Sequence, residues 1–270
     1  MKTIYAMSDI HGMIGPFRKR LDQLNMDEFR SGKATLILLG DYIDRGYNSL
    51  KVLETIYDLK RDLKDNMITL MGNHDKWFLN FLEGHNPGWI GNSQATAFVS
   101  QFIPEEEMGK VYTLLSRYRQ DLISDIARKA FEAYNRDLYS WMKSLPLYHE
   151  TEHQIYVHAG IDEEAGDLWM YGTGDETFYE KYPPENGHFY KDIIAGHVST
   201  STASGHRNNH EIYYDGESHF YIDGIDSYPA DAKEKDCIIP LLQYTEDNGH
   251  GRYYSISPDG HKTLICEKKW

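Results

Sequence analysis

Five short β-prone runs, each ending in a cluster of polar residues, constrain the fold of this chain more than any other sequence feature. They cover residues 3–7, 34–39, 67–71, 154–157 and 193–195. The second run is apolar except for Thr35, which is typical of a strand buried on both faces. Apolar residues recur at helical spacing over 16–24 and 49–64, between the first three runs. This strand–helix–strand order predicts an α/β fold with parallel strands.

The polar clusters follow the strands at their carboxyl ends, where open α/β sheets gather their ligands. Together the clusters supply six oxygen and nitrogen donors and no sulfur: Asp9, His11, Asp41, Asn73, His158 and His197. In the hard–soft classification these are hard to borderline ligands, and such a set suits Mn²⁺, Fe or Zn²⁺. Because a carboxylate can bridge two ions, six ligands with one shared suit a pair of metals about 3.5–4 Å apart.

One motif is specific enough to outweigh a purely structural explanation. An Asp or Asn beside glycine at a strand end is usually a turn residue, and a lone histidine is more often a hydrogen-bonded structural residue than a ligand. Gly-Asp-Tyr-Ile-Asp-Arg-Gly at 40–46 specifies five positions, which chance supplies in such a chain less than about once in a thousand. Asp-Ile-His-Gly at 9–12 precedes it and Gly-Asn-His-Asp at 72–75 follows it, which makes coincidence negligible.

These motifs, with His-Ala-Gly at 158–160 and Gly-His at 196–197, resemble those of the calcineurin-like metallophosphoesterases. The likeness is greatest to the phosphoprotein phosphatase branch, which includes bacterial serine/threonine phosphatases and symmetrical diadenosine tetraphosphatases. The likeness extends over about residues 3–244. The resemblance implies a four-layer α/β/β/α sandwich with a dinuclear metal centre at the edge of two packed sheets.

The resemblance also implies roles for the site residues. Asp9, His11 and Asp41 would hold one metal, and Asp41, Asn73, His158 and His197 would hold the other. Arg45 would grip phosphate oxygens with its planar fork, His74 would protonate the leaving alkoxide, and Asp44 would orient the His74 ring. Arg45, Asn73 and His74 would therefore contact the substrate. A hydroxide bridging the two cations would attack phosphorus in line, without a phosphoenzyme.

The function implied by the resemblance is a metal-dependent phosphoesterase that hydrolyses phosphate monoesters. A bacterial-type serine/threonine protein phosphatase is the leading interpretation, with a phosphorylated protein or a small phosphorylated molecule as substrate. The alternative is a dinucleoside tetraphosphate hydrolase, which cleaves a phosphoanhydride with the same centre. A non-catalytic binding module on this fold is a third interpretation, although such proteins usually lose ligands or the acid. The cofactors would be two divalent ions, manganese foremost, with iron or zinc as alternatives.

Two positions depart from the phosphoprotein phosphatase pattern. That branch has a second arginine between the two late histidine ligands, whereas residues 159–196 contain no arginine and only Lys181 and Lys191 as lysines. Arg207 is a candidate substitute. Asp75 stands where the branch usually has glutamate, and its shorter side chain is expected to reach a different partner.

The charge balance restricts the class of partner. The chain has 28 basic and 42 acidic residues, a formal net charge of −14, so it lacks the basic face that holds a long polyanion. A nuclease and a nucleic-acid partner are therefore disfavoured. Two dications beside Arg45 and His74 would still create a local positive site for a small phosphate group. Since no apolar run suits a membrane span or a leader, we expect a cytoplasmic protein without a membrane partner.

Residues 1–270 are expected to form a single metallophosphoesterase domain. Residues 92–145 carry apolar side chains at helical spacing, which predicts a helical insertion beside the sheet and along one side of the site. The C-terminal part, residues 210–268, contains β-rich runs separated by turn signals, which predicts an antiparallel meander in a second sheet packed on the first. Aromatic residues between the two late histidines are expected mainly to pack, with stacking on a nucleobase as the alternative. They are Tyr171, Phe178, Tyr179, Tyr182 and Phe189.

Overall fold

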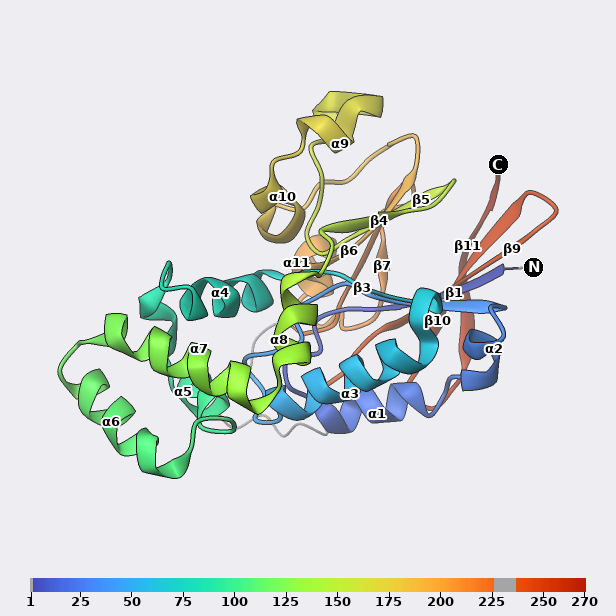
Figure 1. Ribbon diagram of the computed structural model, residues 1–270. Helices are drawn as coiled ribbons and strands as arrows, with labels where there is room; N and C mark the ends of the chain where they lie inside the picture. Colours follow the sequence, from blue (N-terminus) through green and yellow to red (C-terminus); the bar gives the residue numbers. More distant parts are fainter. Residues whose placement is uncertain (1, 226–236) are drawn as a thin grey trace.

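The computed structural model describes residues 2–225 and 237–270, which form two β-sheets flanked by helices (Figure 1). The first sheet has six strands in the order β11–β10–β9–β1–β2–β3. Its strands are β1 (Lys2–Met7), β2 (Ala34–Leu38), β3 (Met67–Thr69), β9 (Leu241–Asp247), β10 (His250–Ile256) and β11 (Lys262–Lys269). The second sheet has five strands in the order β4–β5–β6–β8–β7. They are β4 (Tyr148–Glu150), β5 (Gln154–Val157), β6 (Asp192–Ser199), β7 (Tyr213–Tyr214) and β8 (His219–Asp223).

Parallel pairing places the predicted site loops at shared sheet edges. β1 is parallel to β2, and β2 is parallel to β3. In the second sheet β5, β6 and β8 are parallel. The carboxyl ends of the first three strands therefore lie side by side, as do those of β5 and β6, in agreement with the parallel α/β arrangement predicted from the sequence.

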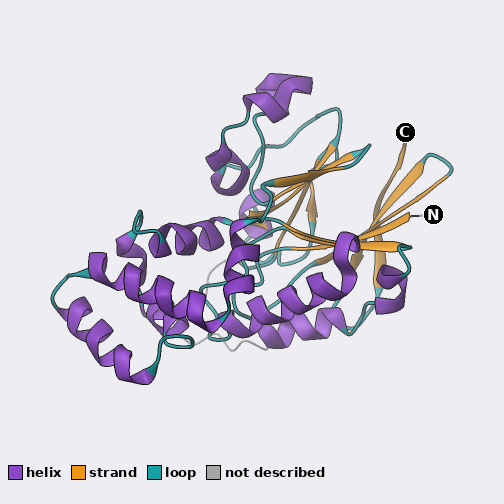
Figure 2. Cartoon of the chain, in the orientation of Figure 1, coloured by secondary structure: helices purple, strands orange, loops and turns teal. Residues whose placement is uncertain are grey.

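Helices cover the outer faces of both sheets (Figures 1 and 2). The first sheet is covered by α1 (Ile14–Leu21), α2 (Met26–Arg30) and α3 (Ser49–Leu63). The second carries α9 (Trp169–Gly172), α10 (Asp175–Glu180) and α11 (Thr200–Ser204). The first helix ends at Leu21, three residues before the predicted end, and the predicted helix over 49–64 is α3. The short helix α2 has no counterpart in the sequence prediction, because five residues are too few to show helical periodicity.

The alternation of side chains along the strands produces the layers. Successive strand residues point to opposite faces. Leu36 of β2 packs toward the helices, whereas its neighbour Ile37 packs between the sheets with Tyr156. On the far side of the second sheet, Val157 packs with Trp169. The protein therefore has four layers, which are helices, the first sheet, the second sheet and helices, with a buried apolar cluster between each layer and the next. This arrangement confirms the predicted four-layer α/β/β/α sandwich.

The C-terminal runs divide between the two sheets, so the prediction that they form the second sheet together is wrong. β7 and β8 lie in the second sheet, while β9, β10 and β11 form an antiparallel meander that joins the first sheet beside β1. The reason lies in β9, where Leu241 packs in the helix-facing core and Leu242 packs between the sheets. A strand buried on both faces belongs inside a sheet. Residues 226–236 of the predicted C-terminal part lie outside the described residues.

The predicted helical insertion consists of four α-helices. They are α5 (Ser93–Val99), α6 (Glu105–Ser116), α7 (Ile123–Tyr134) and α8 (Arg136–Lys143). The insertion packs on α4 (Asn73–Leu82) through aromatic contacts, in which the Phe78 ring centroid lies 4.9 Å from Phe98 and 5.3 Å from Phe131. Among the helices of the described residues, none combines the length and apolar character that crossing a bilayer requires.

Candidate metal centre

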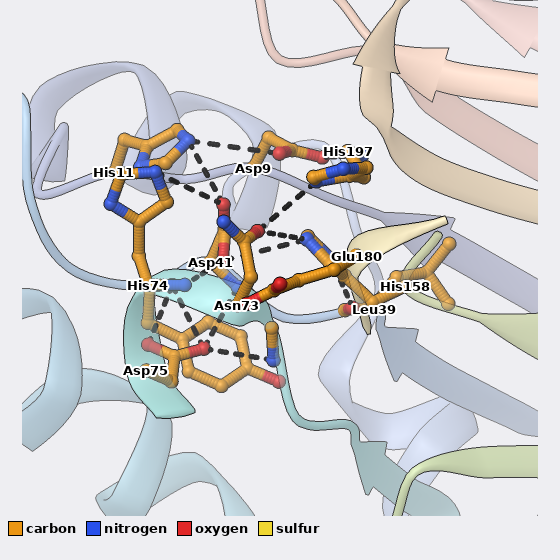
Figure 3. Close-up of polar contacts among 12 residues, drawn as sticks. Asp9, His11, Leu39, Asp41, Asn73, His74, Asp75, His158, Glu180 and His197 are labelled. Atoms are coloured by element: carbon orange, nitrogen blue, oxygen red, sulfur yellow. Dashed lines mark hydrogen bonds and ion pairs between the residues drawn. The ribbon is translucent and has the colours of Figure 1, made fainter. Parts of the chain in front are cut away.

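The six predicted donors come from both sheets and meet at one place (Figure 3). Asp9 and His11 follow β1, Asp41 follows β2, Asn73 begins α4, His158 follows β5 and His197 lies in β6. His197 differs from the prediction, because it lies within its strand and not after it. The pairing of β6 with β8 shifts register between Ala195 and Ser199. Such an irregularity re-aims a side chain, and here it turns His197 toward the other donors.

Backbone conformation marks this site as unusual. Six of the nine non-glycine residues with positive φ in the described part of the chain belong to the predicted site. They are Asp9, His11, Asp41, Asp44, Arg45 and His197. Each such residue costs on the order of 1–3 kcal/mol, and such strain persists only where the surrounding structure enforces it. The fold therefore holds these side chains in place at the expense of stability.

Direct contacts join the two sheets at the donors. The backbone N–H of His197 donates to Asp9 Oδ2 at 3.0 Å. His158 Nδ1 lies 2.9 Å from the carbonyl oxygen of Leu39, so this nitrogen carries the proton and donates. A Cβ atom at Gly196 would collide with the side chains of Ser8 and Asp9, so the close approach of the sheets requires glycine there.

Asp9, His11 and Asp41 form the first group of donors. His11 Nδ1 lies 2.8 Å from the Ile43 carbonyl oxygen and donates to it, which leaves a lone pair on Nε2. That Nε2 lies 3.6 Å from Asp9 Oδ1 and 3.3 Å from Asp41 Oδ2. It is buried and has no hydrogen-bond partner.

Asp41, Asn73, His158 and His197 form the second group. Asn73 Oδ1 lies 3.0 Å from His158 Nε2 and 3.1 Å from His197 Nδ1. His158 Nε2 is also 3.5 Å from Asp41 Oδ1. The two oxygens of Asp41 thus face different groups, Oδ2 toward His11 and Oδ1 toward His158, as a bridging ligand requires.

The donors fit divalent cations better than they fit one another. In its neutral form the Nε2 of His11 offers a lone pair to carboxylate oxygens, and the Nε2 of His158 offers one to an amide oxygen. Contacts between acceptors are repulsive, and a cation between them removes the conflict. Nδ1 of both rings donates to a backbone carbonyl, the partner that commonly fixes the tautomer of a metal-binding histidine.

The protonation of the donors supports the same conclusion. Burial lowers the pKa of His11, and it lowers the pKa of His197 to about 4. Both rings are therefore neutral at pH 7, which is the form that binds a metal. Burial would raise the pKa of Asp41, but the His158 and His74 rings lower it. The neighbouring His11 ring lowers the pKa of Asp9 in the same way, against the effect of burial.

His74 is held beside the first group of donors, with a ring nitrogen close to His11 and Asp41. Its Nδ1 lies 2.8 Å from Asp44 Oδ2, and its Nε2 is 4.0 Å from Asp41 Oδ2. The indole of Trp77 covers the His74 ring at a centroid distance of 4.6 Å, and Trp77 Nε1 donates to Glu180 Oε1. Burial would lower the pKa of His74, but Asp41 and Asp44 outweigh it and raise this pKa. His74 thus presents its Nε2 toward Asp41, at the edge of the donor groups.

Asp75 reaches a partner set that the sequence does not reveal. Its Oδ2 accepts from the backbone N–H groups of Asp41 at 2.8 Å and Gly72 at 3.2 Å, and its Oδ1 accepts from Tyr42 at 3.1 Å. The side chain is fully buried. Burial and the nearby Asp41 raise the pKa of Asp75, whereas the N–H donors oppose this rise. Asp75 therefore fixes the backbone that presents Asp41.

A pocket of about 200 Å³ opens beside the second group. Arg45 and His197 line it together with Tyr182, an aromatic residue that is 70% exposed, and the buried Asp223. Of the other aromatic residues in this segment, Phe178 and Phe189 pack in the core of the second sheet, as expected.

No lysine or arginine takes the place of the missing second arginine in this pocket, within the described part of the chain. Lys181 contacts the Ile161 carbonyl and pairs with Glu185 at 2.6 Å. Lys191 pairs with Glu150 at 2.8 Å. Arg207 is exposed and does not line the pocket, so the proposed substitution finds no support. Arg45 is the one cationic side chain among the lining residues.

Comparison with known proteins decides the family. Residues 2–228 match the calcineurin-like phosphoesterase family. The chain belongs to this family. Curated relatives of this phosphoesterase include the symmetrical bis(5'-nucleosyl)-tetraphosphatases of Nitrosospira multiformis and Chromobacterium violaceum. The first is 30% identical over 160 residues, covering 59% of this chain and 44% of the relative. The second is 29% identical over 159 residues, covering 59% and 43%. The matched part thus spans less than half the length of these relatives.

Solved structures resemble the whole fold of this phosphoesterase. A cold-active protein tyrosine phosphatase superposes with a TM-score of 0.61 at 18% identity, covering 98% of this chain and 79% of that one. The cold-active protein tyrosine phosphatase of a psychrophilic Shewanella gives a TM-score of 0.58, also at 18% identity, covering 98% and 81%. At this identity the likeness establishes the shared fold.

Sequence reasoning misses several residues around the centre of this phosphoesterase. Trp77 and Trp89 contact the His74–Asp44 pair, and Asp223 lines the pocket. Trp77 follows the Gly-Asn-His-Asp motif one helical turn after His74, a spacing that could have revealed it. Trp89 shows no such signal, because only the folded insertion brings it to Asp44.

Proposed function

We propose that this phosphoesterase is a metal-dependent phosphohydrolase with two divalent ions held by Asp9, His11, Asp41, Asn73, His158 and His197. The observation that carries the proposal is the position of Asp41, whose two carboxylate oxygens face separate groups of donors. When bound, the ions supply Lewis acidity and an activated water. Manganese is the first metal to test, since oxygen and imidazole ligands without sulfur accommodate it, with iron and zinc as alternatives.

The remaining site residues would bind substrate and move a proton. Arg45 would bind phosphate oxygens from the pocket wall, because its fork matches two oxygens at once. His74 would give its Nε2 proton to the leaving oxygen while Asp44, 2.8 Å from Nδ1, stabilises the charged ring. Asn73 would contact substrate from beside His74 in addition to binding a metal.

The proposed substrate is a dinucleoside tetraphosphate. The curated relatives are named symmetrical tetraphosphatases, which supports the phosphoanhydride alternative better than the serine/threonine protein phosphatase expected first. Tyr182, exposed at the pocket, is placed to stack on a nucleobase.

Product analysis tests this proposal. The purified protein with Mn²⁺ should convert diadenosine tetraphosphate to ADP, faster than it releases phosphate from a phosphoserine peptide. Asp41→Asn should reduce the rate of the preferred reaction about 100-fold or more, and His74→Asn should reduce the hydrolysis of phosphate monoesters with a basic leaving group by a similar factor. Asp58→Asn, at an exposed helix position, is the matched control and should have no effect. Failure to hydrolyse any phosphoester or phosphoanhydride with Mn²⁺, Fe²⁺ or Zn²⁺ would point to the non-catalytic binding module.

Phosphate monoester hydrolysis is the second candidate, and the His74–Asp44 pair favours it. An alkoxide leaving group is strongly basic and needs a proton, whereas a nucleoside diphosphate leaves readily as an anion. A preference for phosphomonoesters over the tetraphosphate in the same assay would establish this candidate.

A further inference from the structure

A second tryptophan, Trp89, donates a hydrogen bond to the carboxylate that holds the proposed proton donor. Trp89 Nε1 lies 3.1 Å from Asp44 Oδ2. The same oxygen lies 2.8 Å from His74 Nδ1. The other oxygen of this carboxylate, Oδ1, is buried and has no hydrogen-bond partner. We propose that Trp89 is a positioning residue for leaving-group protonation, acting through Asp44 on His74. This inference rests on the role proposed for His74.

The indole of Trp89 is held rigidly. Trp89 lies in the short 3₁₀ helix η2 (Pro87–Gly91), just before the helical insertion, and is 6% exposed. The side chain of Asn92 donates to the Trp89 carbonyl at 3.0 Å and accepts from the N–H of Ala95, which caps α5. The ring packs against Phe78 and Phe81 at centroid distances of 5.3 and 5.1 Å. The N–H therefore points at Asp44 from a fixed position.

Two donors on one oxygen define the orientation of the Asp44 carboxylate. With both bonds present, Oδ2 stays in line with His74 Nδ1, and the His74 ring keeps Nε2 directed toward Asp41. Without the indole N–H, the carboxylate has only His74 as a donor, because Oδ1 has none. It can then rotate, and the ring loses its fixed direction. The cost is expected in the step that uses the proton and not in substrate binding.

The need for that proton depends on the leaving group, which gives a sharp kinetic test. Phenolate is a strongly basic leaving group, with a conjugate-acid pKa of about 10 like that of tyrosine. 4-Nitrophenolate is much less basic and departs without a proton. Trp89→Phe should lower kcat for phenyl phosphate about 10-fold or more, with KM unchanged. With 4-nitrophenyl phosphate, kcat should change less than about 2-fold, as expected when the proton is not used.

Two further variants serve as a negative and a positive control. Trp169→Phe removes an equally buried indole whose N–H donates to the Tyr190 hydroxyl at 3.0 Å, away from the His74–Asp44 pair. It should leave both rates unchanged. His74→Asn should show the same dependence on the leaving group as Trp89→Phe, with a larger loss. If Trp89→Phe lowers both rates equally or raises KM, Trp89 supports the fold only and the inference fails.

A structural readout keeps the test independent of turnover. Replacement of Trp89 by β-(3-benzothienyl)alanine keeps the ring shape and exchanges the N–H for sulfur, so the aromatic packing is preserved. In protein labelled with ¹⁵N-histidine, the Nδ1 proton of His74 should give a downfield, slowly exchanging NMR signal. This signal should shift or broaden in the benzothienyl protein and stay unchanged in Trp169→Phe.

The outcomes separate the inference from the proposed function. An unchanged His74 signal in the benzothienyl protein would overturn the inference even if the enzyme is active. The inference would also be overturned if His74→Asn loses activity but Trp89→Phe shows the same dependence on the leaving group as the wild type. The proposed function would stand in that case. If the wild type hydrolyses no phosphate compound, the proposed function fails, and the NMR comparison then decides only whether Trp89 orders the pair.

Discussion

Replacement of Asp75 tests whether one buried carboxyl group holds the loop that presents the proposed bridging ligand. Asp75→Asn keeps the size of the side chain but puts an NH₂ group where one acceptor stood. If the amide oxygen takes the Oδ2 position, it keeps the donors from Asp41 and Gly72, and the N–H of Tyr42 loses its 3.1 Å bond to Oδ1 and keeps only a 3.4 Å contact with Oδ2. A buried N–H that loses its partner costs at most about 1–3 kcal/mol. Asp75→Ala removes both acceptor oxygens and leaves three N–H groups without these bonds, so the expected cost is about 3–9 kcal/mol at the same value per group.

The assay is unfolding in urea after treatment with a chelator, so that metal binding does not contribute. Asp58→Asn and Asp58→Ala, at an exposed position of α3, should change the free energy of unfolding by less than about 0.5 kcal/mol. With Mn²⁺ added, the wild type should gain more stability than Asp75→Asn, because Asp41 is less well placed in the variant. Unfolding free energies within about 0.5 kcal/mol of the wild type for both Asp75 variants would refute this reasoning.

Two further predictions concern substrate binding and pH. Arg45→Lys should lower kcat/KM for the preferred phosphate substrate about 10-fold to 100-fold, because an ammonium cannot make the two parallel bonds of a guanidinium. An unchanged kcat/KM would show that Arg45 does not bind the phosphate group. His219 lies 3.0 Å from both Glu163 Oε1 and Asp215 Oδ2. Burial would lower the pKa of His219, but these carboxylates raise it above its ordinary value of 6.5. Its contribution to stability is therefore full below pH 6.5 and lost as pH rises through the raised pKa. Accordingly, His219→Gln should destabilise the protein more at pH 6 than at pH 9 in urea unfolding, and an equal or larger effect at pH 9 would contradict the pairing.

Local sequence patterns predict the parallel part of the fold well, because a strand buried on both faces carries mostly apolar side chains on both of them. Residues 34–39 are such a run and form β2, and the helical spacing over 49–64 corresponds to α3. The C-terminal strands are different. Their alternation shows that they are strands but not which sheet they join, since this depends on long-range pairing of β9 with β1.

The same limit applies to the candidate site. Ordered motifs predict that Asp9, Asp41 and His158 approach one another, because each follows a strand whose end has a defined place in the sandwich. The bulge that re-aims His197 and the bond from Trp89 to Asp44 depend on tertiary packing. No local pattern encodes either feature, so both required the structure.

Metal content tests the central claim most directly. Crystals soaked in Mn²⁺ and analysed by anomalous scattering should show two peaks about 3.5–4 Å apart on either side of Asp41, and elemental analysis should find two ions per chain. Asp41→Asn should reduce the content to one ion or none. Absence of ions from this place in the wild type, or two ions retained without the Asp41 carboxylate, would contradict the dinuclear centre.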